Sequence, residues 1–331
     1  MPAVVLVTMA KRRISTRFGG DIVTKSRSIQ IVGAAIGQGA QDHGCASGPQ
    51  ALRSAGLVPR LQARGLSAAW ETTLRTEAAT APLPAVRGLS ARLSQRVKGI
   101  VQAGELPLVI GGDHSCAIGT WRGVAAATAT RGPLGLLWID AHMDAHVPAT
   151  SPSGALHGMP LACLLGYGEE SLVDVTRGGC LRPENVCLVG VRSFEDGEAE
   201  LLARFGVRVF FMDEVRRRGL PAVMQDAQRI LRRAAGGFGI TLDIDALDPR
   251  EAPGVGSPVP GGLSAEALSR SLAPLAADER MLALEIVEYN PLRDSEGRTA
   301  AVVCKLAGDI LSCAAHGPVA ASTPWATEQL V

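Results

Sequence analysis

One stretch of the chain decides the fold, LGLLWIDAHMD at residues 134–144. Its first six residues are apolar or glycine, which is typical of a parallel strand buried on both faces of a sheet. The run ends in Asp140, His142 and Asp144, which occupy alternate positions. Alternate side chains of an extended backbone point to the same side, so these three can converge on one point. The stretch therefore predicts a buried strand with a polar site at its carboxyl end.

Two further segments repeat this pattern. FGITLDID at residues 238–245 ends in Asp243 and Asp245, and LPLVIGGDHS at residues 106–115 adds His114. In open α/β sheets, sites form in the crevice beyond the carboxyl ends of the strands, so we predict that the three strand ends form one metal centre. A lone Asp-X-Asp is more often a cap or a turn. Three such ends, however, would leave unpaired charge beside the core unless a cation compensated it.

Strands and helices alternate along the chain from residue 29 onward. The predicted strands are 29–32, 106–110, 134–139, 185–189, 207–211, 238–242 and 281–287, and the predicted helices are 49–63, 90–103, 196–204, 220–235, 297–314 and those beginning near 116, 158 and 264. This alternation predicts an α/β fold with a mostly parallel sheet covered by helices on both faces. The loops 143–157 and 246–262 directly follow ligand-bearing strands, and we expect them to contact a substrate.

Composition and charge narrow the classes of partner. The chain has 331 residues, of which 47% are hydrophobic and 4% aromatic, and a net charge of +1. No linker separates the predicted ligands, so we expect one catalytic domain over residues 29–331. Near-neutral charge and few aromatics argue against nucleic acid or a membrane surface as partner, and no apolar run is long enough to span a bilayer. We expect a small-molecule substrate.

The basic N-terminus and the cysteines bear on location. Residues 1–28 contain one acidic residue, Asp21, and we expect a flexible extension, with a transit peptide as the alternative.

The seven cysteines form no CxxC pair and no zinc framework, which favours a reducing, cytoplasmic setting. Cys116 could be a ligand or nucleophile, but its surroundings predict the start of a helix with the thiol packed inside.

Five motifs resemble, in order and spacing, the ureohydrolases, the family of arginase, agmatinase and their relatives. They are GGDHS at 111–115, DAHMD at 140–144, SGALHG at 153–158, DIDALDP at 243–249 and EYNP at 288–291. The match extends from about residue 29 to 315. It implies a three-layer α/β/α fold with an eight-stranded parallel sheet, and a homo-oligomer that is a trimer or a hexamer.

The resemblance also implies two Mn²⁺ ions per subunit that share a hydroxide. One ion would bind His114, Asp140, Asp144 and Asp243, and the other Asp140, His142, Asp243 and Asp245. Oxygen ligands with only two imidazoles suit Mn²⁺ better than Zn²⁺. A pre-formed hydroxide is needed because the delocalised charge of a guanidinium makes its carbon a poor electrophile. Asp144 would orient that hydroxide and help carry the proton to the leaving amine.

Two more residues gain catalytic roles from the resemblance. Glu288 matches the carboxylate that pairs with the substrate guanidinium; an ordinary glutamate at a strand end is the alternative. His157 matches the imidazole that carries protons between solvent and the site, which its near-neutral pKa permits. The alternative is a loop histidine that only makes hydrogen bonds within the protein.

The substrate is expected to be L-arginine, cleaved to L-ornithine and urea. Ser153 matches the serine at the α-carboxylate, and Glu195 stands where arginases place an aspartate near the α-amino group. His146 and Ala155 stand where arginases have asparagines, although His146 could still donate a hydrogen bond to the carboxylate. These positions predict a preference of at least about tenfold for L-arginine over agmatine. Agmatine or a guanidino acid is the alternative substrate.

Two other functional classes remain open. A metal-binding pseudoenzyme would keep the fold without turnover, but every matching ligand and Glu288 are present. A metal-dependent deacylase on a related α/β fold is disfavoured, because Glu288 offers an anion suited to a cationic substrate.

Overall fold

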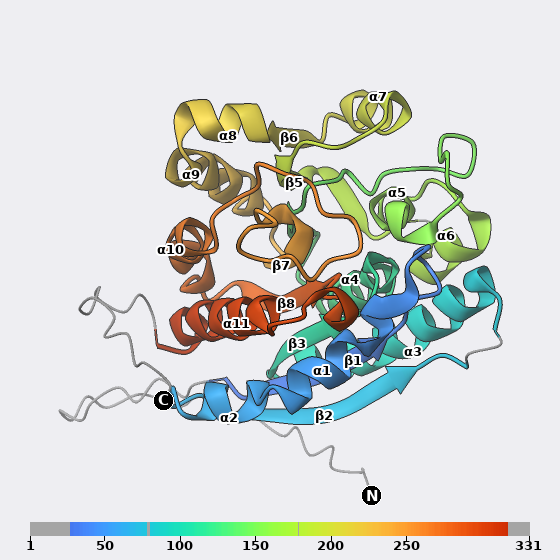
Figure 1. The fold of residues 1–331 in the computed structure, drawn as a ribbon. Coiled ribbons are helices and arrows are strands. Elements are labelled where there is room, and N and C mark those ends of the chain that lie inside the picture. The colour runs from blue at the N-terminus through green and yellow to red at the C-terminus, as the bar shows by residue number, and fades with distance from the viewer. Residues whose placement is uncertain (1–26, 78–79, 178, 317–331) are drawn as a thin grey trace, which may run out of the picture.

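Eight strands form one parallel sheet in the order β2-β1-β3-β8-β7-β4-β5-β6 (Figure 1). The structure is a computed structural model that describes residues 27–77, 80–177 and 179–316. In sheet order the strands are β2 Ala68–Arg75, β1 Ile29–Ala35, β3 Leu106–Gly111, β8 Met281–Val287, β7 Phe238–Asp243, β4 Leu134–Ile139, β5 Leu181–Val191 and β6 Arg208–Phe211. The predicted α/β class with an eight-stranded parallel sheet is confirmed.

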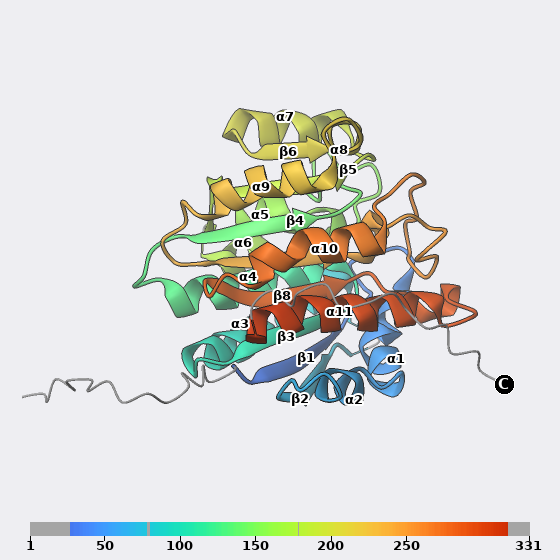
Figure 2. The same cartoon turned by 90° about the vertical axis from the view of Figure 1, so that its left-hand side faces the viewer.

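Helices cover both faces of this sheet, which gives the three expected layers (Figures 1 and 2). The core on one face includes residues of α1 Gly48–Ser54, α2 Leu57–Gln62, α8 Met212–Arg218, α9 Leu220–Leu231, α10 Ala265–Ala276 and α11 Arg298–His316. The core on the other face includes residues of α3 Pro82–Gln102, α4 Ala117–Thr128, α5 Pro160–Leu164, α6 Glu170–Thr176 and α7 Asp196–Phe205.

Strand β4 shows why the central strands are apolar at every position. Leu137 and Ile139 belong to the core on one face, whereas Leu136 and Trp138 belong to the core on the other. Consecutive side chains of a strand point to opposite faces, so a strand covered on both faces must bury every residue. All six residues of β4 are buried. The continuous apolar run of the sequence is thus explained.

The topology brings the predicted site residues together. Strands β3 and β4 are consecutive in the chain, yet β8 and β7 lie between them in the sheet. The four neighbours β3, β8, β7 and β4 run parallel, so their carboxyl ends meet at one edge. Each of these ends leads into one of the motifs identified in the sequence. The crevice expected at this edge of the sheet is where the site lies.

The edge strand β2 has no counterpart among the strands predicted from residue patterns. Its sequence, AAWETTLR, is only partly buried, with Glu71 and Arg75 exposed. An edge strand that is half exposed lacks the continuous apolar run that marks β3 or β4. The periodicity signal was therefore too weak to separate it from a loop.

Some helix boundaries also differ from the prediction. The sequence predicts one helix over 49–63, whereas the structure has α1 and α2, separated at Gly56 with φ of 80°. A left-handed residue cannot continue a right-handed helix, and glycine adopts this conformation without steric cost. Helix α3 begins at Pro82 rather than near residue 90.

The predicted extension over residues 1–28 lies outside the described residues, apart from Arg27 and Ser28. Arg27 donates a hydrogen bond of 2.7 Å to the carbonyl of Met281. Within the described ranges, no helix is both long and apolar enough to cross a membrane.

Gly112, just after β3, is expected to tolerate no side chain. A Cβ at this position would lie 1.8 Å from the carbonyl oxygen of Ile36. We expect Gly112→Ala to lower the free energy of unfolding by about 1–3 kcal/mol, because the backbone must move to make room. Gly88→Ala on α3 is the matched control, since nothing lies within 4 Å of its Cβ. Urea denaturation measures both, and equal midpoints would contradict the steric argument.

Candidate metal centre

His114, directly after β3, lies against three carboxylates. Its Nδ1 atom is 3.2 Å from Asp140 Oδ2, 2.9 Å from Asp144 Oδ2 and 3.1 Å from Asp243 Oδ2. The imidazole is fully buried, and Nδ1 nevertheless makes no hydrogen bond. A buried nitrogen without a hydrogen bond, facing three carboxylate oxygens, is the arrangement expected where a cation binds. The residues present therefore fit a metal ion.

A second group of ligand atoms adjoins the first. His142 Nδ1 lies 3.0 Å from Asp245 Oδ2 and 3.6 Å from Asp140 Oδ1. Asp140 thus belongs to both groups, and its bridging of two ions stays a prediction. Asp243 reaches the first group through Oδ2, while its Oδ1 accepts a hydrogen bond of 2.8 Å from the Asp245 amide. Bridging by Asp243 stays a prediction.

A chain of buried side chains fixes the orientation of His114. Its Nε2 atom lies 3.1 Å from Thr241 Oγ1, and this hydroxyl donates to Glu285 Oε2 at 2.8 Å. Trp121 Nε1 donates to the same carboxylate oxygen at 2.9 Å. The ring also stacks on Trp138, with centroids 4.3 Å apart. Because Nε2 is directed at Thr241, Nδ1 is the nitrogen that faces the carboxylates.

The electrostatics of the group favour a cation. Burial raises the pKa of Asp243 well above its usual range, and the nearby charges of Asp245 and Asp140 add to the effect. Burial opposes the charged form of His114, but the adjacent carboxylates of Asp140, Asp144 and Asp243 outweigh it and raise its pKa. Carboxylates this close cannot all be ionised without a counter-charge. Metal binding would release the protons that they hold, so metal affinity should rise with pH.

Backbone strain also concentrates here. Among the described residues, three that are not glycine have positive φ: Asp144 at 51°, Arg177 at 58° and Glu288 at 65°. Two of the three belong to the predicted site. Residues that are not glycine adopt this region at a cost, and such strain is found preferentially at functional sites.

The buried Glu288 pairs with the partly exposed His157 beside the ligand group. His157 Nδ1 lies 2.9 Å from Glu288 Oε1, and the same oxygen accepts a hydrogen bond of 2.8 Å from the His114 amide. Burial opposes the charge on His157, but the Glu288 carboxylate outweighs it and raises the pKa of His157 to about 9. The structure thus brings both predicted catalytic residues to the same edge as His114.

This pair yields a measurable titration. In metal-free protein we expect the His157 imidazole to titrate near 9, against 6.5 for an ordinary histidine, and Glu288→Gln to lower its pKa. Because the folded pKa is raised, the pair stabilises the fold fully below 6.5 and loses this contribution as the pH rises through 9. NMR of the imidazole protons measures the pKa. A value below about 7 in metal-free protein would contradict the pairing.

Comparison with known proteins places the chain among its relatives. The profile of the arginase family matches residues 27–313. The arginase of Brevibacillus brevis is 40% identical over 299 residues, which covers 86% of this chain and 98% of the relative. The crystal structure of Bacillus subtilis arginase has a TM-score of 0.81 at 35% identity, covering 86% of this chain and 98% of that chain. Entamoeba histolytica arginase in complex with L-ornithine has a TM-score of 0.79 at 27% identity, covering 87% and 99%.

The chain belongs to the arginase family. It is therefore related to metal-dependent hydrolases of C–N bonds other than peptide bonds, and its histidine and aspartate groups could hold the metal. The resemblance read from the five sequence motifs is confirmed.

In this member of the arginase family, the predicted substrate-binding residues line one cavity of about 250 Å³ together with four of the proposed ligands, His142, Asp144, Asp243 and Asp245. His146, Ser153 and Glu195 lie along it, together with His157 and Glu288. The loop 143–157 supplies much of the lining, and Ser257 of the loop 246–262 adds to it. The cavity therefore connects the predicted guanidinium partner to the residues expected at the other end of the substrate.

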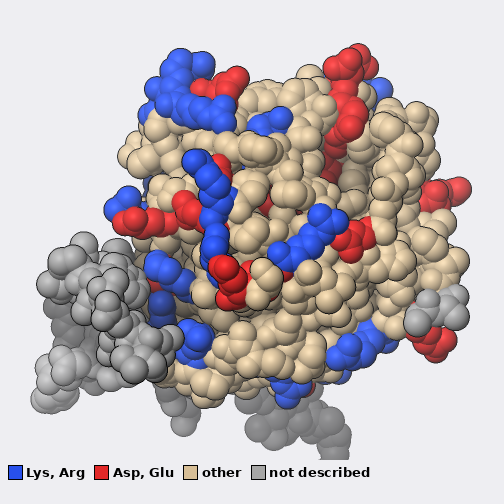
Figure 3. All heavy atoms as spheres, in the orientation of Figure 1, with Lys and Arg blue, Asp and Glu red and all other residues tan. Residues whose placement is uncertain are grey.

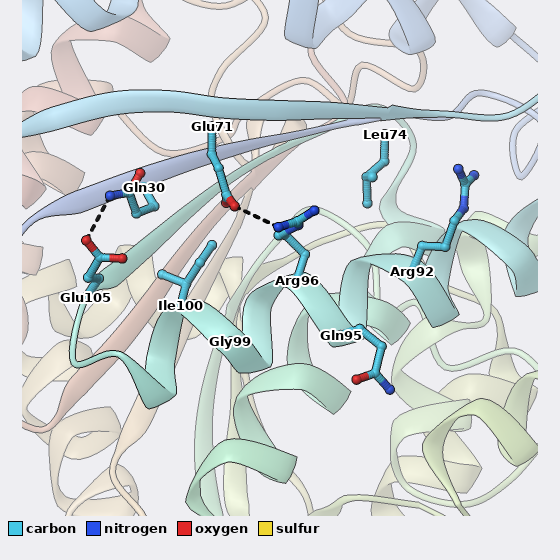
Figure 4. Close-up of a pocket in the computed structure, with 9 residues that line it drawn as sticks. All are labelled: Gln30, Glu71, Leu74, Arg92, Gln95, Arg96, Gly99, Ile100 and Glu105. Atoms are coloured by element: carbon cyan, nitrogen blue, oxygen red, sulfur yellow. Dashed lines mark hydrogen bonds and ion pairs between the residues drawn. The ribbon is translucent and has the colours of Figure 1, made fainter.

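A larger cavity of about 780 Å³ lies elsewhere, between β2 and α3 (Figure 4). Two polar pairs lie in its lining: Arg96 binds Glu71 at 3.0 Å, and Gln30 donates to Glu105 at 2.8 Å. None of its lining residues belongs to a group that could hold a metal ion. On the face seen in Figure 3, basic and acidic side chains lie interspersed among uncharged ones.

Several residues that support the site were not singled out in the sequence. Glu198 on α7 accepts a hydrogen bond of 3.0 Å from the Ala145 amide, next to Asp144. Asp113 accepts a hydrogen bond of 2.8 Å from the Gly39 amide and so holds the glycine-rich loop against the site. One available signal was a carboxylate within an apolar strand: Glu285 stands in the middle of MLALEIV and is fully buried.

Proposed function

We propose that this protein hydrolyses L-arginine to L-ornithine and urea as a dinuclear manganese enzyme. The observation that carries the proposal is the Nδ1 atom of His114, which makes no hydrogen bond and faces three carboxylates, while the His114 amide donates a hydrogen bond to Glu288. Membership of the arginase family supports the reaction class. The L-ornithine bound to the Entamoeba histolytica relative supports the product.

The proposed ligands are those implied by the sequence. One ion is assigned to His114, Asp140, Asp144 and Asp243, and the other to Asp140, His142, Asp243 and Asp245. Four carboxylates and two imidazoles are a donor set that suits Mn²⁺. When bound, the two cations would supply a water of lowered pKa and offset the crowded negative charge.

The side chains of this chain would handle the substrate and the protons. Glu288 would pair with the guanidinium and hold its carbon in place. Asp144 would accept a hydrogen bond from the attacking water and pass its proton to the leaving nitrogen as the C–N bond breaks. His157, already hydrogen-bonded to Glu288, would exchange protons with solvent. Water supplies the oxygen of urea, and the amine leaves as L-ornithine.

A urea-release assay tests the function directly. Purified protein with added Mn²⁺ would be given L-arginine, agmatine and 4-guanidinobutanoate. We expect turnover of L-arginine that a chelator abolishes and Mn²⁺ restores. Release of urea from agmatine or the guanidino acid with none from L-arginine would reassign the substrate. No release from any of the three would indicate a metal-binding pseudoenzyme.

Two further parts of the proposal concern assembly and location. We expect a homo-oligomer, a trimer or a hexamer, which light scattering of the purified protein would measure. We also expect a cytoplasmic location, supported by the cysteine pattern of the sequence.

A further inference from the structure

Three side chains that line the same cavity as Glu288 form a cluster: His146, Glu195 and Glu198. His146 Nε2 lies 2.9 Å from Glu195 Oε2 and 3.3 Å from Glu198 Oε2. Its Nδ1 lies 3.1 Å from the hydroxyl of Thr150. Both ring nitrogens are therefore engaged within the chain. His146 has no nitrogen left to donate to a substrate carboxylate.

The cluster holds Glu195 in one position. Glu198 is buried and fixed by hydrogen bonds from the Ala145 and Glu195 amides at 3.0 and 3.1 Å. Glu195 itself is more than half exposed and would otherwise sample several rotamers. Its contact with the nearly buried His146 orders the carboxylate before a substrate arrives. Ordering in advance lowers the entropic cost of binding a cationic group.

Among the described residues, no lysine or arginine side chain lines this cavity to receive a carboxylate. Its described lining contains histidines, carboxylates, serines and small residues, but neither lysine nor arginine. The arginine nearest in sequence to Glu195, Arg192, is committed elsewhere. Its guanidinium donates to the carbonyls of Asp245 and Val259, each at 2.7 Å, and thereby ties the loop 246–262 to the end of β5.

Two neutral hydroxyls of the loop 143–157 are available to a substrate carboxylate. Ser151 and Ser153 each accept a backbone hydrogen bond, from Gly154 at 3.0 Å and Ala155 at 3.2 Å, so each hydroxyl proton is free to donate. Ser153 is exposed to water. A neutral hydrogen bond that competes with water contributes less than a charge-assisted one.

We propose that His146 is a specificity-determining residue that positions Glu195, so that the enzyme recognises the amino group of its substrate and is nearly indifferent to the carboxylate. The inference rests on the proposed function, since it concerns the same site and the same substrates. It predicts a smaller difference between L-arginine and agmatine than the preference of at least about tenfold expected from the sequence. L-Arginine remains a substrate, but its amino group carries the discrimination.

Four guanidines separate the two groups: L-arginine has both, agmatine only the amine, 5-guanidinopentanoate only the carboxylate, and butylguanidine neither. Two pairs differ only in the amine: L-arginine against 5-guanidinopentanoate, and agmatine against butylguanidine. We expect the amine to raise kcat/KM by about tenfold or more in both of these pairs. We expect the carboxylate to change kcat/KM by no more than about threefold, both between L-arginine and agmatine and between 5-guanidinopentanoate and butylguanidine. A carboxylate effect larger than the amine effect would overturn the inference. If none of the four released urea, the proposed function itself would fail.

Variants of the cluster test whether it causes this increase of kcat/KM by the substrate amine, the amine effect. We expect Glu195→Gln to reduce the amine effect to about threefold or less, and His146→Ala to reduce it at least about threefold while leaving the carboxylate effect unchanged. Glu200→Gln is the matched control, because it removes the same charge from an exposed position of the same helix, α7. Thermal unfolding midpoints would establish that each variant is folded.

The ratio of kcat/KM between substrates with and without the amine distinguishes a positioning role of His146 from a purely structural one. A general loss of structure would lower kcat/KM for all four guanidines alike, whereas release of Glu195 lowers it only for the two amines. An unchanged amine effect in His146→Ala would show that His146 does not position Glu195. An unchanged amine effect in Glu195→Gln would show that another group recognises the amine.

Discussion

Replacing Asp243 with alanine is expected to abolish hydrolysis and to strip the protein of metal. Asp243 Oδ2 is one of three carboxylate oxygens around His114 Nδ1, and the proposed assignment gives it to both ions. Loss of a residue that only hydrogen-bonds to a metal ligand already lowers metal affinity by about 10–100-fold. Loss of a ligand shared by both ions should lower it further. Elemental analysis after dialysis would count the ions, and urea release would measure turnover.

Two comparisons make this experiment specific. Asp213→Ala removes the same group from an exposed position on α8 and should change neither metal content nor turnover. His142→Ala should weaken the second ion while the group around His114 stays complete. Two ions and normal turnover in Asp243→Ala would falsify the ligand assignment.

The Glu288→Gln variant is expected to keep both metals yet lose nearly all turnover. Glu288 is buried, pairs with His157 and carries none of the proposed metal contacts. Glutamine keeps the shape but removes the charge that would face the guanidinium. Truncated buried charge pairs typically cost about 2–5 kcal/mol, which here would appear as a loss of kcat/KM.

The same metal analysis and urea assay decide this second case. Glu200→Gln again provides a matched loss of charge on the surface and should behave as the parent protein. Unchanged kcat/KM in Glu288→Gln would move the guanidinium site elsewhere. Loss of metal together with turnover would instead make Glu288 a support for His114, whose amide it binds.

The extent to which the sequence predicted the site differs between its parts. Asp140, His142 and Asp144 could be grouped from their alternate positions after a buried run, because that periodicity is a local property of an extended chain. Grouping them with His114 and Asp243 needed one further rule, that parallel strands end at a shared edge. Glu288 and His157 gained roles only from family resemblance, because neither stands in a pattern that implies its chemistry.

For the fold, too, local patterns were predictable and the arrangement of distant segments was not. The buried strands were evident from continuous apolar runs, since both faces of each strand are covered. Strand β2 was not evident, because this edge strand buries only one of its eight residues fully and so shows no continuous apolar run. The order of the strands also could not be read along the chain, where β3 precedes β4 with no sign that β8 and β7 lie between them.

The sequence by itself determined the residue types of the proposed metal ligands, the parallel α/β class and the arginase-like motifs, because these depend on residue identity and short-range periodicity. Only the tertiary structure decided which partners those residues have. His146 meets Glu195 and Glu198 across about fifty residues of chain, and His114 is oriented by Thr241 and Glu285 from two other strands. Such contacts arise from packing between distant segments, and hydrogen-bond partners chosen by packing leave no periodic trace in the sequence.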